Sequence, residues 1–144
     1  MPTNGTCYDI GSFDINGSHK DTITNHGLCY LGVDLESGKN VDLVIDKEWN
    51  PIADNSIGLL VSGSCLEHVE APWKFVETMY KKMAKDSIGI VTLPFMKKQH
   101  KYPIDCYRIL PDGLKYLFGK HVQFDIIECD FTVECIDTYI VVKK

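Results

Sequence analysis

Three aspartates lie at the ends of three short apolar runs, where a ligand with hydroxyl groups could bind. They are Asp9, Asp34 and Asp46. A carboxylate at the tip of a strand that follows a glycine turn can accept hydrogen bonds from both hydroxyls of a ribose. The alternative for Asp34 alone is a solvated loop acid. Three such acids on neighbouring runs indicate a nucleoside site more specifically than any one of them.

A turn with two glycines follows the first run. Gly11 allows the chain to turn tightly, and Gly17 permits a left-handed backbone or a close approach of a ligand. The alternative is a hairpin whose turn is Asn16-Gly17. A dinucleotide-binding fingerprint fits poorly, because Phe13 and Ile15 stand where it has glycines.

A second turn of small residues, Ser62, Gly63 and Ser64, follows the fourth run. It lacks the second glycine of the G-x-S-x-G turn, so a serine hydrolase is disfavoured. Glu67 and His68 come next and could be an acid–base pair or metal ligands. The second histidine of H-E-x-x-H is missing, however. A lone histidine near a helix start is more often structural, and its place at this edge of the sheet leaves a ligand contact as an equal alternative.

A long polar and aromatic segment spans residues 94–108. Loops placed by a rigid scaffold often carry function, and the basic side chains here could attract an anionic group. The alternative is a solvated connection in which Asp105 and Arg108 only pair with each other. Arg108 is the only arginine of the chain. The candidate residues of this segment are His100, Tyr102, Asp105, Tyr107 and Arg108.

Seven short apolar runs, rich in β-branched residues, predict the strands that position these side chains. Several are apolar on successive residues, which is typical of a parallel sheet covered on both faces. The last two runs, separated by residues 129–132, predict an antiparallel hairpin. The predicted strands are 7–10, 28–33, 41–45, 57–61, 88–93, 124–127 and 135–142.

Helices are predicted between some of these strands. Residues 71–84 form the clearest one, with Pro72 in its first turn and an apolar face at helical spacing. A shorter helix is predicted over 111–118, with Gly119 ending it, and one short helix fits between Gly17 and Leu28. The connections 35–40 and 46–57 are too short for crossover helices.

Length and composition predict one globular domain over residues 1–144, and the alternation of predicted strands with helices predicts the α/β class. Apolar residues make up 44% and charged residues 24%, which excludes a disordered chain. The formal charge of -5 disfavours general binding to nucleic acid or a membrane surface. The sequence begins without a basic or apolar stretch, so we expect no secretory signal, and it has no apolar run long enough to span a bilayer.

Six cysteines occur without a C-x-x-C pair. This disfavours a zinc ribbon, and the absence of an export signal disfavours a disulfide framework. We expect reduced thiols, mostly buried in strands, in a cytoplasmic protein.

Residues 7–144 resemble a class I S-adenosylmethionine (SAM)-dependent methyltransferase of the type 11 group. The motifs that carry the resemblance are D-I-G-S-F-D-I-N-G, G-V-D-L, N-V-D-L-V-I-D and P-I-A-D-N-S-I-G-L-L-V-S-G-S-C-L-E-H-V-E-A-P-W. The segment H-K-Y-P-I-D-C-Y-R-I-L-P-D-G is similar to one subset of the family. The resemblance implies a Rossmann-like, mostly parallel sheet of about seven strands, with a C-terminal antiparallel hairpin and few helices.

The resemblance also implies site residues. Asp34 would bind the ribose of SAM, Leu35 would lie against the adenine, and Asp46 would meet the adenine amino group. His68 and His100 are the candidate catalytic bases. The implied cofactor residues are Asp9, Gly11, Ser12, Phe13, Gly17, Asp34, Leu35, Asp46, Ser62, Gly63, Ser64 and His68. The implied acceptor residues are His100, Tyr102, Asp105, Tyr107 and Arg108.

We therefore expect methyl transfer from SAM to a small-molecule or saccharide-like acceptor, with S-adenosylhomocysteine (SAH) as product and no metal. The helix that often precedes the first strand in this family is not expected here, nor are helices between the middle strands. The alternative is a non-catalytic SAM- or SAH-binding subunit. A second copy or another protein could supply the missing cap.

Overall fold

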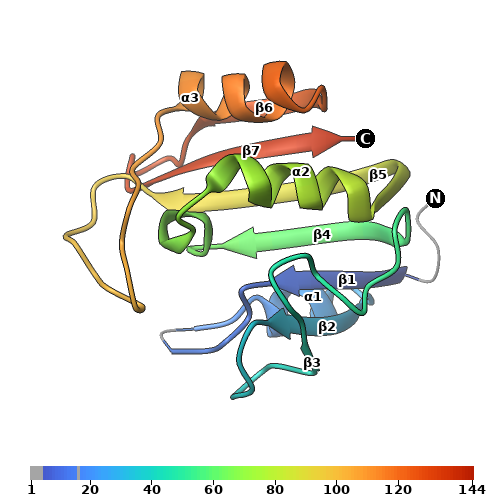
Figure 1. The fold of residues 1–144 in the computed structure, drawn as a ribbon. Helices are drawn as coiled ribbons and strands as arrows, with labels where there is room; N and C mark the ends of the chain where they lie inside the picture. The colour runs from blue at the N-terminus through green and yellow to red at the C-terminus, as the bar shows by residue number, and fades with distance from the viewer. Residues whose placement is uncertain (1–4, 16) are drawn as a thin grey trace.

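A seven-stranded mixed sheet organises the chain. The computed structural model describes residues 5–15 and 17–144. The strands lie in the order β3-β2-β1-β4-β5-β7-β6 (Figure 1). They are β1 (Thr6–Ile10), β2 (Cys29–Asp34), β3 (Leu43–Val44), β4 (Ile57–Gly63), β5 (Met83–Pro94), β6 (Asp125–Phe131) and β7 (Asp137–Lys143).

The first five strands of this order pair in parallel, and β7 runs antiparallel to both β5 and β6. All seven predicted strands and the final hairpin are thus confirmed. The hairpin turn lies later than predicted, because β6 continues through Phe131. There the N–H of Thr132 donates to the carbonyl of Asp137 at 2.9 Å, and the N–H of Asp137 donates back to the Thr132 hydroxyl at 3.2 Å.

The helices are few, as predicted. Figure 1 shows α2 in front of β4 and β5, and α1 behind β1 and β2. Both connections that flank β3 lack a helix. No helix of the described residues is long and apolar enough to cross a membrane. The helical elements are α1 (Lys20–Asn25), η2 (Leu66–His68), α2 (Pro72–Lys82), α3 (Pro111–Lys115) and η3 (Tyr116–His121).

Helix α2 packs the predicted apolar face onto the sheet. Val76 and Met79 of α2 are fully buried, and they lie in one hydrophobic core with Leu60 of β4 and Met83 of β5. The helix ends two residues before the predicted end, because Met83 adopts extended backbone and pairs with Ile57 of β4. Burial of this face holds α2 and the short η2 before it against the sheet.

Gly119 does not end the last helix, contrary to the prediction. The helix continues through it as the wider π turns of η3. A Cβ at Gly119 would lie 2.8 Å from the Cδ1 atom of Ile126. The glycine therefore allows β6 to approach the helix closely, and it is not a stop signal.

The six cysteines are free, as expected. The prediction that most are buried in strands is wrong, because only Cys7 is buried. Cys29, Cys106 and Cys135 are exposed, and the other two are partly exposed. The error has a physical cause: two of the exposed ones lie in loops, and Cys29 opens β2 at the rim of the sheet.

Replacing Leu60 with alanine should lower the free energy of unfolding by about 2–5 kcal/mol, because the side chain is fully buried at the centre of the sheet. Ile127→Ala is the matched control on the exposed edge strand β6 and should change stability by no more than about 0.5 kcal/mol. Urea unfolding of both variants measures the difference. Equal losses would contradict this description of the core.

Candidate functional site

The carboxyl ends of β1, β2, β4 and β5 lie at one edge of the sheet, because these strands are parallel. Figure 1 shows the arrowheads of β4 and β5 directed to the same side, where the long loop before α3 also extends. Ligands of open α/β sheets bind at such an edge. Most of the predicted site residues follow these strand ends.

The glycine turn after β1 is tied to β2. The N–H groups of Gly11 and Ser12 both donate to the carbonyl of Val33, at 2.9 and 3.2 Å. Gly11 has φ +81°, and a Cβ there would lie 2.6 Å from Cβ of Cys65. The turn therefore needs glycine both for its left-handed backbone and for its packing on the loop after β4.

The end of this turn includes Asn16, which lies outside the described residues. The alternative of a hairpin at Asn16-Gly17 is wrong, because α1 follows the turn and β1 pairs in parallel with β2 and β4. Gly17 has φ +136° and donates its N–H to Oδ1 of Asp14 at 2.9 Å. Asp14 also accepts from Lys39, which together with the Gly17 bond holds the pKa of its carboxyl below the usual value. Asp14 thus links the turn to the loop after β2.

Asp34 and the glycine turn meet directly. Oδ2 of Asp34 accepts the N–H of Phe13 at 3.0 Å, and Oδ1 accepts that of Leu35 at 2.7 Å. A carboxylate offers about four acceptor positions, so Oδ2 can still accept from a ligand hydroxyl. The ring of Phe13 lies over Gly38, where an added Cβ would be 2.3 Å from it. Leu35 is exposed.

Asp9 is buried between two partners that the sequence analysis did not identify as site residues. The hydroxyl of Tyr30 donates to its Oδ2 at 3.1 Å, and Nδ1 of His19 lies 3.4 Å from its Oδ1. The hydrogen bond to Asp9 raises the pKa of His19. The imidazole also covers Gly63, where an added Cβ would lie 2.4 Å from it. Only the position of His19 just after the glycine turn could have indicated this.

Two other predicted cofactor residues, Ser62 and Asp46, bond within the protein, and a third, Ser64, is exposed. The buried Ser62 donates its hydroxyl to the carbonyl of Ile10 at 2.8 Å. Asp46 closes its own turn by accepting the N–H groups of Glu48 and Asn50, and its bonds with Asn50 lower its pKa. Ser64 is exposed, with φ +51°.

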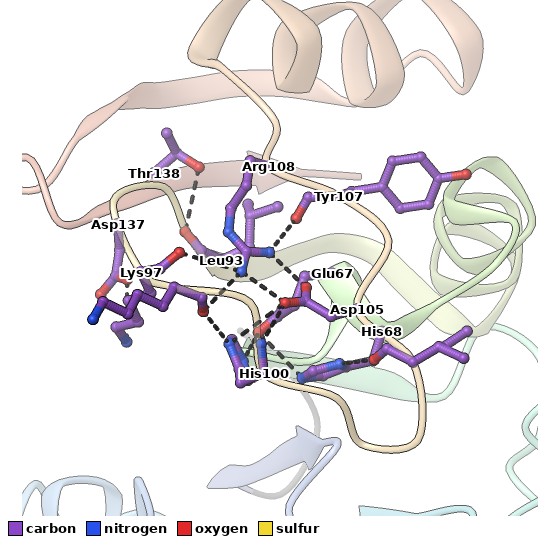
Figure 2. Close-up of polar contacts among 12 residues, drawn as sticks. Glu67, His68, Leu93, Lys97, His100, Asp105, Tyr107, Arg108, Asp137 and Thr138 are labelled. Atoms are coloured by element: carbon purple, nitrogen blue, oxygen red, sulfur yellow. Dashed lines mark hydrogen bonds and ion pairs between the residues drawn. The ribbon is translucent and has the colours of Figure 1, made fainter.

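Glu67, His68 and His100 converge into what we call the His–Glu cluster (Figure 2). The two histidines come from different elements: His68 ends η2, and His100 lies in the loop before α3. Each places its Nε2 atom 3.5 Å from Oε1 of Glu67. The two imidazole rings stand edge to face, with centroids 5.0 Å apart.

Glu67 is fully buried, and burial raises the pKa of its carboxyl although both histidines act in the opposite direction. Neither carboxylate oxygen accepts a hydrogen bond from the described residues. Its backbone carbonyl accepts the N–H groups of Cys106 and Tyr107, at 2.7 and 3.3 Å. The residue that carries the cluster's acid thus also holds the loop that carries His100.

Asp105 and Arg108 pair with each other, as the structural alternative predicted. The two guanidinium nitrogens donate to Oδ1 and Oδ2 of Asp105 at 2.6 and 2.8 Å, which holds the pKa of that carboxyl far below its usual range. Asp105 also accepts the N–H of His100 at 2.7 Å. The pair therefore shapes the loop around His100.

The remaining acceptor candidates lie nearby. The hydroxyl of Tyr107 donates to the carbonyl of Glu70 at 3.0 Å. Tyr102 is exposed, and its ring centroid is 6.4 Å from that of His68. A shallow pocket of about 300 Å³ opens on this loop, and its lining residues are Lys97, Gln99, Asp105, Cys106, Tyr107 and Arg108.

The strand order, with its antiparallel β7 between β5 and β6, defines the fold of class I SAM-dependent methyltransferases. No family model and no curated protein matches the sequence. Solved structures do match. A SAM-dependent methyltransferase from Archaeoglobus fulgidus superposes with a TM-score of 0.70 at 16% identity, over 96% of this chain and 86% of that one.

Two further structures extend this comparison. The 1,6-didemethyltoxoflavin-N1-methyltransferase of Burkholderia thailandensis, with bound SAH, has a TM-score of 0.73 at 10% identity, over 96% of this chain and 70% of that chain. The Haloferax volcanii complex between the Trm112 methyltransferase activator and a protein described as a methyltransferase also matches. Its TM-score is 0.72 at 11% identity, over 99% of this chain and 83% of that chain. These identities show a shared fold, and the reaction has to be argued from this chain's own residues.

Replacing Gly11 with alanine should destabilise the protein more than the same change at Gly27. Both glycines have positive φ, +81° and +75°, but a Cβ at Gly27 meets no atom within 4 Å. Gly27→Ala should therefore show only the backbone cost of about 1–2 kcal/mol, and Gly11→Ala should exceed it because of Cys65. Urea unfolding measures both, and equal losses would contradict the close packing of the turn.

Proposed function

We propose that the protein is a SAM-dependent methyltransferase that acts on a small-molecule or saccharide-like acceptor. The observation that carries this proposal is the hydrogen bond between the N–H of Phe13 and Asp34. It joins the glycine turn after β1 to the acid at the tip of β2, in a sheet with the strand order of these enzymes. The free thiols fit a cytoplasmic location, because thiols stay reduced there.

The residues at the strand ends fit the adenosine part of SAM. Asp34 keeps acceptor capacity for a ribose hydroxyl, and Leu35 next to it exposes an apolar side chain that can lie against a base. Asp9 is a buried acid beside the glycine turn and suits the methionine ammonium group. Phe13 and His19 cover Gly38 and Gly63 at the same edge, so we propose that both rings shift when the cofactor binds.

SAM supplies a methyl group on a sulfonium, and an acceptor lone pair displaces it while the C–S electron pair stays on sulfur. The protein mainly has to position the two reactants, which can lower the barrier by about 7–11 kcal/mol. A hydroxyl acceptor also loses a proton. His68 or His100 can accept it, because the free ring nitrogen of a neutral imidazole can act as a general base. The pocket beside Arg108 is the proposed acceptor site.

A second candidate function is a non-catalytic SAM- or SAH-binding subunit that needs or regulates a partner. Two observations favour it. No helix covers the connections on either side of the two-residue strand β3. In addition, one matching structure contains an activator protein in complex with a chain of this fold. Turnover by the purified protein alone would exclude this candidate.

Asp34→Ala should weaken SAM and SAH binding by about 1–3 kcal/mol, because a ligand hydroxyl loses its acceptor. Calorimetric titration of the variant and the wild type, with ATP and NAD as competing ligands, measures this. Glu36→Ala is the control, since it removes an equal charge from an exposed side chain two residues away. Wild-type affinity in Asp34→Ala would contradict the ribose role, and selective binding of ATP or NAD would contradict the proposed cofactor.

Arg108→Ala should raise the KM for the acceptor and leave the Kd for SAM unchanged, because its contacts with Asp105 and the carbonyls of Lys97 and Lys98 shape the acceptor loop. Steady-state kinetics with any acceptor found in native extract gives KM, and calorimetry gives Kd. If SAM affinity fell equally, the loop would belong to the cofactor site.

A further inference from the structure

The buried carboxylate of Glu67 is the least compensated polar group of the described structure. Its side chain is fully buried, yet neither oxygen accepts a hydrogen bond from the described residues. A buried carboxylate without partners is strongly destabilising. The cation of the neighbouring loop, Arg108, is paired with Asp105 through both terminal nitrogens. Another positive charge is needed at Oε1.

The two imidazoles of the His–Glu cluster are oriented in an unusual way for hydrogen bonding to Glu67. Nδ1 of His68 bonds to the carbonyl of Ile104, and Nδ1 of His100 bonds to the carbonyl of Lys98 at 3.2 Å. A carbonyl only accepts, so each Nδ1 carries the proton. In the neutral rings, both Nε2 lone pairs then face the Glu67 carboxylate. Lone pairs that face a carboxylate repel it unless a proton or a metal cation lies between them, and one proton can bridge only one of the two nitrogen–oxygen pairs.

We propose that the His–Glu cluster binds a divalent transition metal ion such as Zn²⁺, through Nε2 of His68, Nε2 of His100 and one carboxylate oxygen of Glu67. This differs from the sequence-based expectation of no metal. The proposal does not rest on methyl transfer, because metal binding is measured without SAM.

The distances within the cluster fit such an ion. Two ligand atoms that are each about 2.1 Å from one tetrahedral ion lie about 3.4 Å apart. The two Nε2–Oε1 distances are both 3.5 Å, and all three ligand atoms lie within 4.8 Å of one another. Small side-chain movements are enough to bring them into coordination. Figure 2 shows the two imidazoles approaching Glu67 from η2 and from the loop.

The surroundings of the cluster also match a metal site. Histidine ligands usually donate their other ring N–H to a carbonyl or carboxylate, which fixes the tautomer. Both histidines do so here, and Asp105 adds a carboxylate 3.7 Å from Nδ1 of His100. Asp105 itself is fixed by Arg108 and by the N–H of His100.

Ligand type selects the class of metal. Two imidazoles and one carboxylate suit zinc, iron and their neighbours, whereas Mg²⁺ and Ca²⁺ prefer oxygen ligands. Three protein ligands leave a coordination position open. An oxygen atom of an acceptor can fill it, since His68 and His100 remain partly exposed. In that case the histidines hold the ion and do not act as bases.

Titration of the metal-free protein with Co²⁺ tests the proposal, because the visible absorption of Co²⁺ reports its ligands. We expect saturation at one equivalent, displacement by Zn²⁺ and no displacement by Mg²⁺ or Ca²⁺. His68→Ala and His100→Ala should each lower the affinity by at least about 100-fold, more than loss of an outer partner does, and Asp105→Asn should lower it by about 10–100-fold. His121→Ala is the control, because His121 is distant in sequence and pairs on the surface with Glu77.

Several results would overturn the proposal. The wild type could fail to bind Co²⁺, or His100→Ala could bind it as tightly as the wild type. A thiolate absorption band would place the ion on a cysteine and have the same consequence. Because His100 lies in a loop and is one-third exposed, its replacement should leave the fold intact, and circular dichroism checks this.

Glu67→Gln provides a readout independent of spectroscopy. It keeps the shape of the side chain and removes the buried charge. In metal-free protein, the Tm of this variant should equal or exceed that of the wild type. Added Zn²⁺ should raise the Tm of the wild type and leave the variant unchanged. If Zn²⁺ raised both equally, Glu67 would not be a ligand and the proposed site would be wrong.

Discussion

Glu67 joins two parts of the chain at the carboxyl edge of the sheet, and the proposed acceptor side depends on that connection. Its backbone carbonyl holds the loop before α3 through Cys106 and Tyr107. Its carboxylate is the point on which His68 and His100 converge. The residue is buried because η2 follows β4 directly and is covered by that loop. A single position therefore sets both the path of the loop and the charge balance of the cluster.

The proposed cofactor side depends on a different contact, between the glycine turn and β2. One carbonyl, that of Val33, accepts two N–H groups of the turn, and Asp34 accepts a third. These bonds place the turn over the end of β2 and bring Phe13 and His19 onto the same edge. These contacts fix Asp9 and Asp34 in position at this edge. The rings of Phe13 and His19 cover the glycines where a ligand would approach the backbone.

Much of the fold was predictable because the apolar runs are short and distinct. Each strand is defined by residues close in sequence, and α2 shows a clear helical period. The predictions were wrong where contacts between residues far apart in the sequence determine the structure. Gly119 was predicted to end a helix, but a glycine is needed there because Ile126 of β6 packs closely against it. Cys29 and Cys106 are small apolar residues, and only the folded chain determines that they are exposed.

The site was predictable only in its local parts. The acid at Asp34 and the glycine turn follow from motif spacing. The contact of His19 with Asp9 and Gly63 does not, because no short-range pattern marks a histidine that folds back over a strand end. Glu67 and His68 were named from the sequence as possible metal ligands, but no metal was expected, because His100 lies far from them in the sequence and no spacing marks the three as one cluster. Asp105 and Arg108 are only three residues apart in the loop before α3. Their pairing was therefore predictable, as the alternative to an acceptor-binding role.

The charge of the His–Glu cluster limits what it can do. If both imidazoles were protonated at Nε2, two cations would face one buried carboxylate, and their rings are only 5.0 Å apart. If one were protonated, the other would still direct a lone pair at the same oxygen. A single proton cannot satisfy both histidines, because their Nδ1 atoms are already committed to backbone carbonyls. A divalent ion satisfies all three side chains at once, which is why the geometry favours coordination over a simple acid–base pair.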